Sequence, residues 1–76
     1  MDQILRTTMK VERARRDLTQ AQLADLAGTT RKSVNAIETG NMVPSTLLAL
    51  KLAQALGVTV DALFYLESGS TRQMTK

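Results

Sequence analysis

The sequence predicts an all-α fold, a bundle of five short helices, and three observations support this prediction. Apolar residues recur at spacings of three and four, as they do in a helix that buries one face. Threonine or serine precedes these runs and glycine or aspartate follows them, which is typical of helix caps. The composition is 43% hydrophobic but only 3% aromatic, which suits a core of leucine, alanine, valine and isoleucine. Seventy-six residues without a cysteine make one small domain, so we expect no disulfide and no thiolate metal site, and dimerisation would be an economical way to complete the core.

The first seventeen residues predict a weakly specified segment followed by a helix. Residues 1–8 predict either a disordered arm or an edge strand, because isolated apolar residues stand beside threonines that favour extended structure. A helix is predicted from residue 9 or 10 to residue 16, with Val11 and Ala14 on its inward face. Asp17 is expected to end it, since aspartate tolerates the left-handed conformation better than most residues.

Residues 19–38 predict two short helices joined by a tight turn. Thr19 and Gln22 have the spacing of a capping box, in which each side chain binds the other residue's free backbone N–H. The first helix of this pair therefore starts at Thr19. Gly28 is expected to end it, because glycine readily adopts the left-handed conformation that a helix C-terminus often needs.

The second helix of the pair is predicted to have Thr30 as its N-cap. Val34 and Ile37 lie three residues apart and are expected to bury one face. Two helices arranged in this way around a glycine-containing turn make a helix-turn-helix unit. The exposed face near the N-terminal end of the second helix carries Arg31, Lys32 and Asn35.

Two further helices are predicted in the C-terminal half. Residues 39–44 predict a loop that ends in proline, which cannot continue a helix from the preceding residues. Ser45 is the expected N-cap of a helix over residues 46–56, and Thr59 that of a helix over residues 60–64.

The chain contains a longer pattern that matches a known family. The spacing Gln-x-x-Leu-Ala-x-x-x-Gly-x-x-x-x-x-Val-x-x-Ile-Glu-x-Gly, from Gln20 to Gly40, resembles that of the Cro and phage-repressor (Xre-type) DNA-binding domains. Together with Pro44-Ser45 and the segment 57–64, the resemblance covers roughly residues 9–66. It implies a lambda-repressor-like helix-turn-helix domain in a compact, stand-alone family member, flanked by the N-terminal segment 1–8 and a polar C-terminal tail, residues 67–76.

The resemblance also implies two pairings. In the family, an arginine at the position of Arg13 pairs with a glutamate at the end of the second helix of the helix-turn-helix unit, which is Glu38 here. The alternative is that Arg13 is an ordinary solvated charge. In compact members the segment after the last helix pairs with the N-terminal segment in a small antiparallel β-sheet and helps to build a dimer. Here residues 64–67 would pair with residues 6–10. The chain departs from the family pattern at Thr46 and Leu47, and we therefore expect Leu47 to be exposed or in a subunit contact.

The expected ligand is double-stranded DNA, read in its major groove, which distinguishes all four base pairs and is wide enough for a helix. Arg31 matches the two acceptors of guanine, and Lys32 can bind them as a point charge. Asn35 suits a two-bond pairing with adenine, and Thr30 can offer its methyl group to thymine. The alternative is that Arg31 and Lys32 belong to an ordinary solvated helix face.

Phosphate contacts are expected from a second set of polar residues. Gln20 begins a helix, where free amides and the helix dipole attract anions. The weaker candidates are Ser33, Thr39 and Asn41.

The charge distribution favours DNA as the partner. Residues 1–36 hold seven Lys or Arg against four Asp or Glu, whereas residues 37–76 hold three of each. We therefore expect a sequence-specific regulator of transcription, a repressor that binds a palindromic operator as a homodimer. The alternative is an antitoxin or bridging module that uses the same fold to bind a protein.

Other function classes are not expected. Histidine and cysteine are absent and the seven carboxylates are scattered, so neither an enzyme nor a metal or other cofactor is predicted. No small-molecule ligand is expected. No apolar run approaches the ~20 residues that span a bilayer, which predicts a cytoplasmic protein without a membrane segment.

Overall fold

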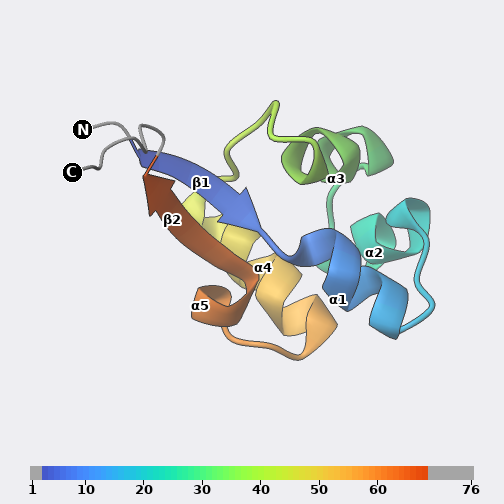
Figure 1. Ribbon diagram of the computed structural model, residues 1–76. Helices are drawn as coiled ribbons and strands as arrows, with labels where there is room; N and C mark the ends of the chain where they lie inside the picture. The colour runs from blue at the N-terminus through green and yellow to red at the C-terminus, as the bar shows by residue number, and fades with distance from the viewer. Residues whose placement is uncertain (1–2, 69–76) are drawn as a thin grey trace.

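The computed structural model describes residues 3–68, which form five helices and one two-stranded sheet (Figure 1). The predicted fold class, including the small sheet, is confirmed. Residues 1–2 of the N-terminal segment and residues 69–76 of the polar tail lie outside the described residues. The elements follow in the order β1 (Gln3–Thr7), α1 (Met9–Arg15), α2 (Gln20–Ala27), α3 (Arg31–Glu38), α4 (Thr46–Leu56), α5 (Val60–Leu63) and β2 (Phe64–Ser68).

Side-chain caps begin four of the helices. Thr19, Thr30, Ser45 and Thr59 each accept a hydrogen bond from the backbone N–H three residues later, at 3.0 to 3.1 Å. Gln22 returns the bond to the backbone N–H of Thr19 at 2.8 Å, which completes the predicted capping box. The predicted starts of α2 to α5 are therefore confirmed.

Left-handed residues follow four of the helices, and one of them is Gly40 (φ 83°), which comes after the cap of α3. Gly28 after α2 has φ 71° and Gly57 after α4 has φ 70°, a conformation that costs a residue with a side chain about 1 to 2 kcal/mol. Asp17, which follows the cap of α1, has φ 54° and is the non-glycine residue with positive φ in the described chain. The prediction that Asp17 ends the first helix in the left-handed conformation is thus confirmed.

The core lies between the helices, where α2 packs against both α3 and α4. Its buried residues are Met9, Leu23, Ala24, Ala27, Val34, Ile37, Leu52, Ala53, Leu56 and Leu63. The predicted inward face of the first helix was wrong: Val11 is 52% exposed and Ala14 is also exposed. Met9 is fully buried instead, and Glu12 and Arg13 are half-buried, because α1 meets the core through its first turn and turns Arg13 toward α3.

The two strands pair antiparallel, with Gln3 opposite Ser68 and Thr7 opposite Phe64. The prediction that residues 6–10 form the first strand was therefore wrong, since the strand lies at residues 3–7. Helix α1 already begins at Met9, whose burial fixes the chain there. The last helix ends at Leu63, one residue earlier than predicted, because Phe64 takes extended backbone angles (φ −129°, ψ 141°) as the first residue of β2.

The backbone carbonyl of Leu63 accepts two hydrogen bonds at the junction between the sheet and the helices. The backbone N–H of Thr8 donates to the carbonyl oxygen of Leu63 at 3.0 Å, and the hydroxyl of Thr7 donates to the same oxygen at 2.9 Å. On the exposed face of the sheet, Arg6 forms an ion pair with Glu67, which raises the pKa of Arg6 through their hydrogen bond. The sheet therefore joins segments from the two ends of the described chain.

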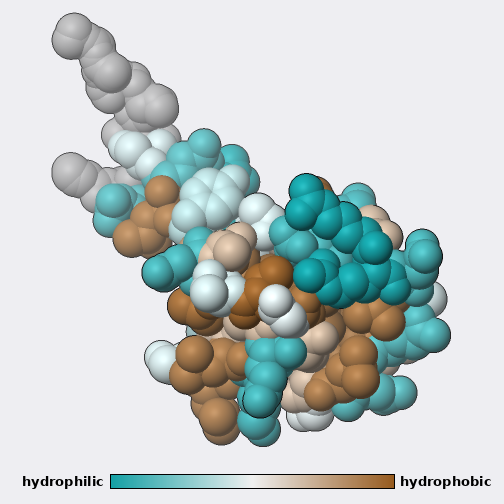
Figure 2. Space-filling view, turned by 90° about the horizontal axis from the view of Figure 1, so that it is seen from below, coloured by the Kyte–Doolittle hydropathy of each residue, from teal (hydrophilic) through white to brown (hydrophobic). Residues whose placement is uncertain are grey.

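Apolar side chains also reach the surface. Figure 2 shows apolar patches beside a strongly hydrophilic cluster on the face seen from below. Leu47 is 63% exposed, in agreement with its departure from the family pattern. The most exposed of the others are Leu26, Val43, Leu50 and Leu66. No helix within residues 3–68 has the length and apolar character needed to cross a bilayer.

Candidate functional site

Helix α3 presents a cationic surface at its N-terminal end. Arg31, Lys32 and Asn35 are exposed and line one surface hollow. Neither Arg31 nor Lys32 forms an ion pair with any described residue, whereas Arg6, Arg13, Arg15 and Arg16 all do.

The position of these cations costs stability. A helix N-terminus carries partial positive charge, so acidic side chains are stabilising there and cations are not. Helix α3 has no acidic residue in its first turn but has Arg31 and Lys32. Such a local cost is typical of a surface that meets an anion from outside the protein.

The opposite face of α3 is fixed from behind. Val34 is fully buried and Ile37 is 3% exposed, and α3 packs against α2. Leu23, Ala24 and Ala27 form the buried face of α2, and the two alanines are small enough to let the helices approach closely. The cationic surface therefore lies on a rigid support.

An ion pair ties the C-terminal end of α3 to α1. Arg13 donates from Nε to Glu38 Oε2 at 2.8 Å and from Nη2 to Glu38 Oε1 at 3.1 Å, while its Nη1 donates to the carbonyl of Leu18 at 2.9 Å. The Glu38 side chain is only 4% exposed and that of Arg13 is 16% exposed. The hydrogen bond to Glu38 raises the pKa of Arg13, although burial opposes this shift, so the guanidinium stays charged.

Gln20 joins this pair to the cationic surface. Its Nε2 donates to Glu38 Oε1 at 3.0 Å and to Asn35 Oδ1 at 3.1 Å. Sequence reasoning assigned Gln20 to a phosphate and missed this bridge. The small residues Ala24 and Ala27 are the sequence feature that could have indicated this bridge. They let α2 pack closely against α3, so the start of α2 lies near α3.

The remaining predicted site residues lie at the two ends of α3. Thr30 accepts from the backbone N–H of Ser33 and donates its hydroxyl hydrogen to Ser33 Oγ at 3.0 Å. At the other end, Thr39 donates to the carbonyl of Asn35 at 2.9 Å and accepts from Asn41 Nδ2 at 3.1 Å. The Thr30 hydroxyl is thus occupied by capping, and its methyl group is the part that remains for an apolar contact.

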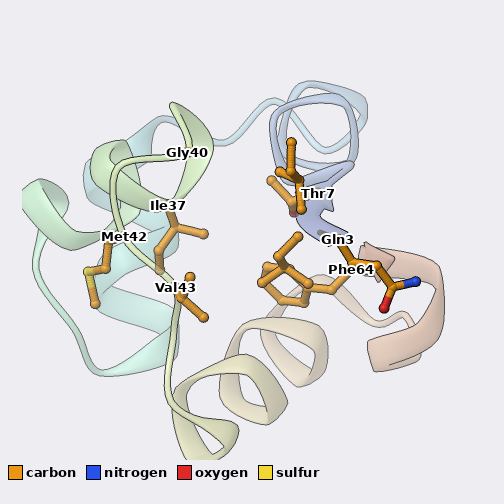
Figure 3. A pocket seen from close by; sticks show the side chains of 9 residues that line it. Gln3, Thr7, Ile37, Gly40, Met42, Val43 and Phe64 are labelled. Carbon is orange, nitrogen blue, oxygen red and sulfur yellow. The ribbon is translucent and has the colours of Figure 1, made fainter. Parts of the chain in front are cut away.

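A separate hollow lies between β1 and the loop that follows α3. Figure 3 shows the side chains of Ile37, Met42 and Val43 on one side of it and those of Thr7 and Phe64 on the other. Its volume is about 260 Å³ and no charged residue lines it. It contains none of the predicted base-reading or phosphate-contacting residues and offers mainly apolar contacts.

Comparison with known proteins finds a matching family model and similar proteins. A helix-turn-helix family model, HTH_3, matches residues 9–63. The chain is 41% identical over 63 residues to the uncharacterized HTH-type transcriptional regulator YgzD of Bacillus subtilis, covering 83% of this chain and 96% of the relative. It is 38% identical, with the same coverage, to an uncharacterized HTH-type transcriptional regulator of Methanocaldococcus jannaschii.

A solved structure shares the fold. The restriction-modification controller protein C.AhdI of Aeromonas hydrophila superposes with a TM-score of 0.69 at 33% identity. The superposition covers 71% of this chain and 82% of that protein.

Proposed function

This chain belongs to the helix-turn-helix (HTH_3) family, and on that basis we propose that it is a transcriptional regulator that binds specific double-stranded DNA through α3. The observation that carries the proposal is the exposed surface of Arg31, Lys32 and Asn35, whose two cations form no ion pair within residues 3–68, on a helix whose opposite face is buried. The relatives that it matches are named HTH-type transcriptional regulators.

The N-terminal end of α3 enters the major groove in this proposal, with Arg31, Lys32 and Asn35 at the base edges and the Thr30 methyl group against a thymine. The backbone N–H of Gln20 binds a phosphate, because both side-chain N–H groups of Gln20 already have partners within the protein. Ser33, Thr39 and Asn41 are the further phosphate-contacting residues. The ion pair of Arg13 with Glu38 keeps the carboxylate turned away from the DNA.

Selection of bound sequences from random duplexes tests this proposal directly. We expect enrichment of a palindrome whose half-sites lie about 34 Å apart, one turn of the double helix. A chain that enriches no sequence and instead co-purifies with a second protein would support the antitoxin or bridging alternative. To act as a repressor, the protein must bind an operator that overlaps a promoter. A reporter assay measures whether it lowers transcription from such a promoter.

Replacing Arg31 by alanine is expected to weaken binding to the preferred duplex by about 1 to 3 kcal/mol and to relax base choice at one position. The reason is the loss of a guanidinium that binds both acceptors of a guanine. Titration of labelled duplexes that differ at single positions measures both effects.

Lys51→Ala is the matched control, because it removes one exposed positive charge from α4 without touching α3. It should leave base preference unchanged. If Arg31→Ala kept the affinity and selectivity of the original protein, the assignment of base reading to α3 would be wrong.

The proposed dimer uses the exposed apolar side chains of α4. Leu47 and Leu50 are 63% and 53% exposed and lie three residues apart on one helix face. Leu50 also lines two surface hollows, one toward α5 and one toward Pro44 and Phe64. A second copy that covers this face would remove these side chains from water.

Leu50→Glu is expected to convert a dimer into a monomer at micromolar concentration, because it places a charge in the apolar contact. Sedimentation equilibrium over a range of concentrations measures the change. Leu26→Glu is the control, since Leu26 is 61% exposed but lies on α2. A wild-type protein that sediments as a monomer at these concentrations would contradict the proposed dimer.

A further inference from the structure

Met42 is the methionine that reaches the surface within residues 3–68. The chain has four methionines and no cysteine, so a thioether is the sulfur group that it offers to an oxidant. Met9 is fully buried, whereas Met42 is half-buried in the loop that follows α3. Because an oxidant must reach the sulfur to convert methionine to its sulfoxide, Met42 is the more susceptible of these two residues.

A surface hollow leads to this side chain. Met42 lines the uncharged hollow between β1 and the loop after α3, together with Ile37, Val43 and Phe64 (Figure 3). The hollow has a volume of about 260 Å³, whereas one water molecule needs only about 10 to 15 Å³ measured in the same way. Hydrogen peroxide is little larger than water and carries no charge, so it can enter the hollow beside Met42.

Met42 also supports the C-terminal end of α3. Its side chain packs against the buried core. Its backbone N–H donates to the carbonyl oxygen of Ala36 at 3.1 Å, and that of Asn41 donates to the same oxygen at 2.8 Å. Ile37, on the buried face of α3, lines the same hollow. A change at Met42 therefore acts on the rear of the helix that carries Arg31 and Lys32.

From this placement we propose that Met42 is an oxidation site, at which a peroxide forms methionine sulfoxide and thereby loosens the support of α3. A lone pair of the sulfur attacks one oxygen of hydrogen peroxide. The S–O bond forms as the O–O bond breaks, and the departing hydroxide takes up the remaining proton and leaves as water. The sulfur loses two electrons and the peroxide gains them. Methionine sulfoxide reductases reverse the reaction.

The sulfoxide fits the hollow poorly. It is a polar group with a strong acceptor oxygen, and burying such a group without a hydrogen bond is unfavourable. The hydroxyl of Thr7, which also lines the hollow, already donates to the carbonyl of Leu63 and accepts from the backbone N–H of Met9. The oxidised side chain therefore turns toward water and draws the loop away from α3. The expected loss of DNA binding rests on the proposed function, whereas the loss of stability does not.

Treatment of the full chain with millimolar hydrogen peroxide tests the site. Peptide mapping by mass spectrometry follows each methionine separately. We expect the sulfoxide of Met42 to form well before that of Met9. The oxidised protein should melt about 4 to 8 °C lower than the untreated protein, as expected for the loss of a modest packing contribution in a domain of this size. Methionine sulfoxide reductases should restore the original melting temperature. Equal oxidation rates at Met42 and Met9 would overturn the proposal.

Met42→Leu is the matched control, because leucine keeps most of the volume and apolar character but cannot be oxidised. Met1 and Met74, which lie outside the described residues, are retained in this variant together with Met9. Peroxide treatment should therefore leave its melting temperature unchanged. An equal loss in wild type and Met42→Leu would show that a different methionine is responsible.

Met42→Gln supplies a second variant that needs no oxidant, since it places a polar amide of similar length in the hollow. Its melting temperature should lie below that of Met42→Leu. If the two variants melt alike, a polar group at this position does not disturb α3, and the proposed consequence of oxidation is wrong.

DNA binding gives a separate result. With a duplex that the wild-type protein selects, the protein oxidised at Met42 should bind more weakly and Met42→Leu treated in the same way should not. If the wild-type protein selects a duplex but oxidation at Met42 changes neither affinity nor melting temperature, the oxidation site has no regulatory effect while the proposed function stands. If the wild-type protein selects no duplex, the proposed function fails, and the oxidation rates and melting temperatures still decide the role of Met42.

Discussion

Replacing Arg13 by methionine is expected to lower the free energy of unfolding by about 3 kcal/mol, because it leaves the carboxylate of Glu38 buried without its cationic partner. The Glu38 side chain is 4% exposed, and after the substitution its one remaining side-chain donor would be Gln20. In a domain of this size such a loss lowers the melting temperature by roughly 12 to 24 °C. Thermal and urea unfolding followed by circular dichroism measure it.

Two further variants separate lost charge pairing from lost packing. Arg16→Met breaks a surface ion pair with Glu12 and should cost no more than about 1 kcal/mol. Combining Arg13→Met with Glu38→Leu should recover most of the lost stability, since no buried charge then lacks a partner. An Arg13→Met protein that melts like the wild type would show that the pair contributes nothing to the fold.

Leu52→Ala is the second substitution with a large expected effect. Leu52 is fully buried where α4 faces α2, and truncating a buried leucine to alanine typically costs about 2 to 5 kcal/mol because a cavity remains. A core of this size rarely supplies more than about 3 to 5 kcal/mol of net stability. We therefore expect the variant to be largely unfolded at 37 °C.

Leu26→Ala is the matched control, because it removes the same atoms from a side chain that is 61% exposed. Its urea midpoint should stay close to that of the wild type. Equal effects of the two substitutions would contradict the burial of Leu52 in the core.

Local features were predictable from the sequence. The N-caps at Thr19 and Thr30 and the left-handed residues Gly28 and Asp17 were identified correctly, because a cap depends on three or four neighbouring residues and not on distant packing. The exposure of Leu47 followed from its departure from the family pattern.

The features that the sequence missed depend on contacts between distant segments. Val11 and Ala14 have helical spacing, but a helix of seven residues is too short for its pattern to decide which face is buried, and Met9 took that place. The register of β1 depends on where β2 meets it, more than fifty residues later. The bridge from Gln20 to Asn35 depends on the angle between α2 and α3, which apolar spacing does not specify.

The antiparallel pairing of Gln3 with Ser68 brings the two ends of the described chain close together. In Figure 1 the outer ends of β1 and β2 point away from α3. A fluorescent protein or affinity label fused beyond either strand would therefore emerge on the side remote from the surface of Arg31 and Lys32 and leave that surface accessible. The same closeness makes the fold suitable for circular permutation, with a short linker from residue 68 to residue 3 and new termini opened in an exposed loop.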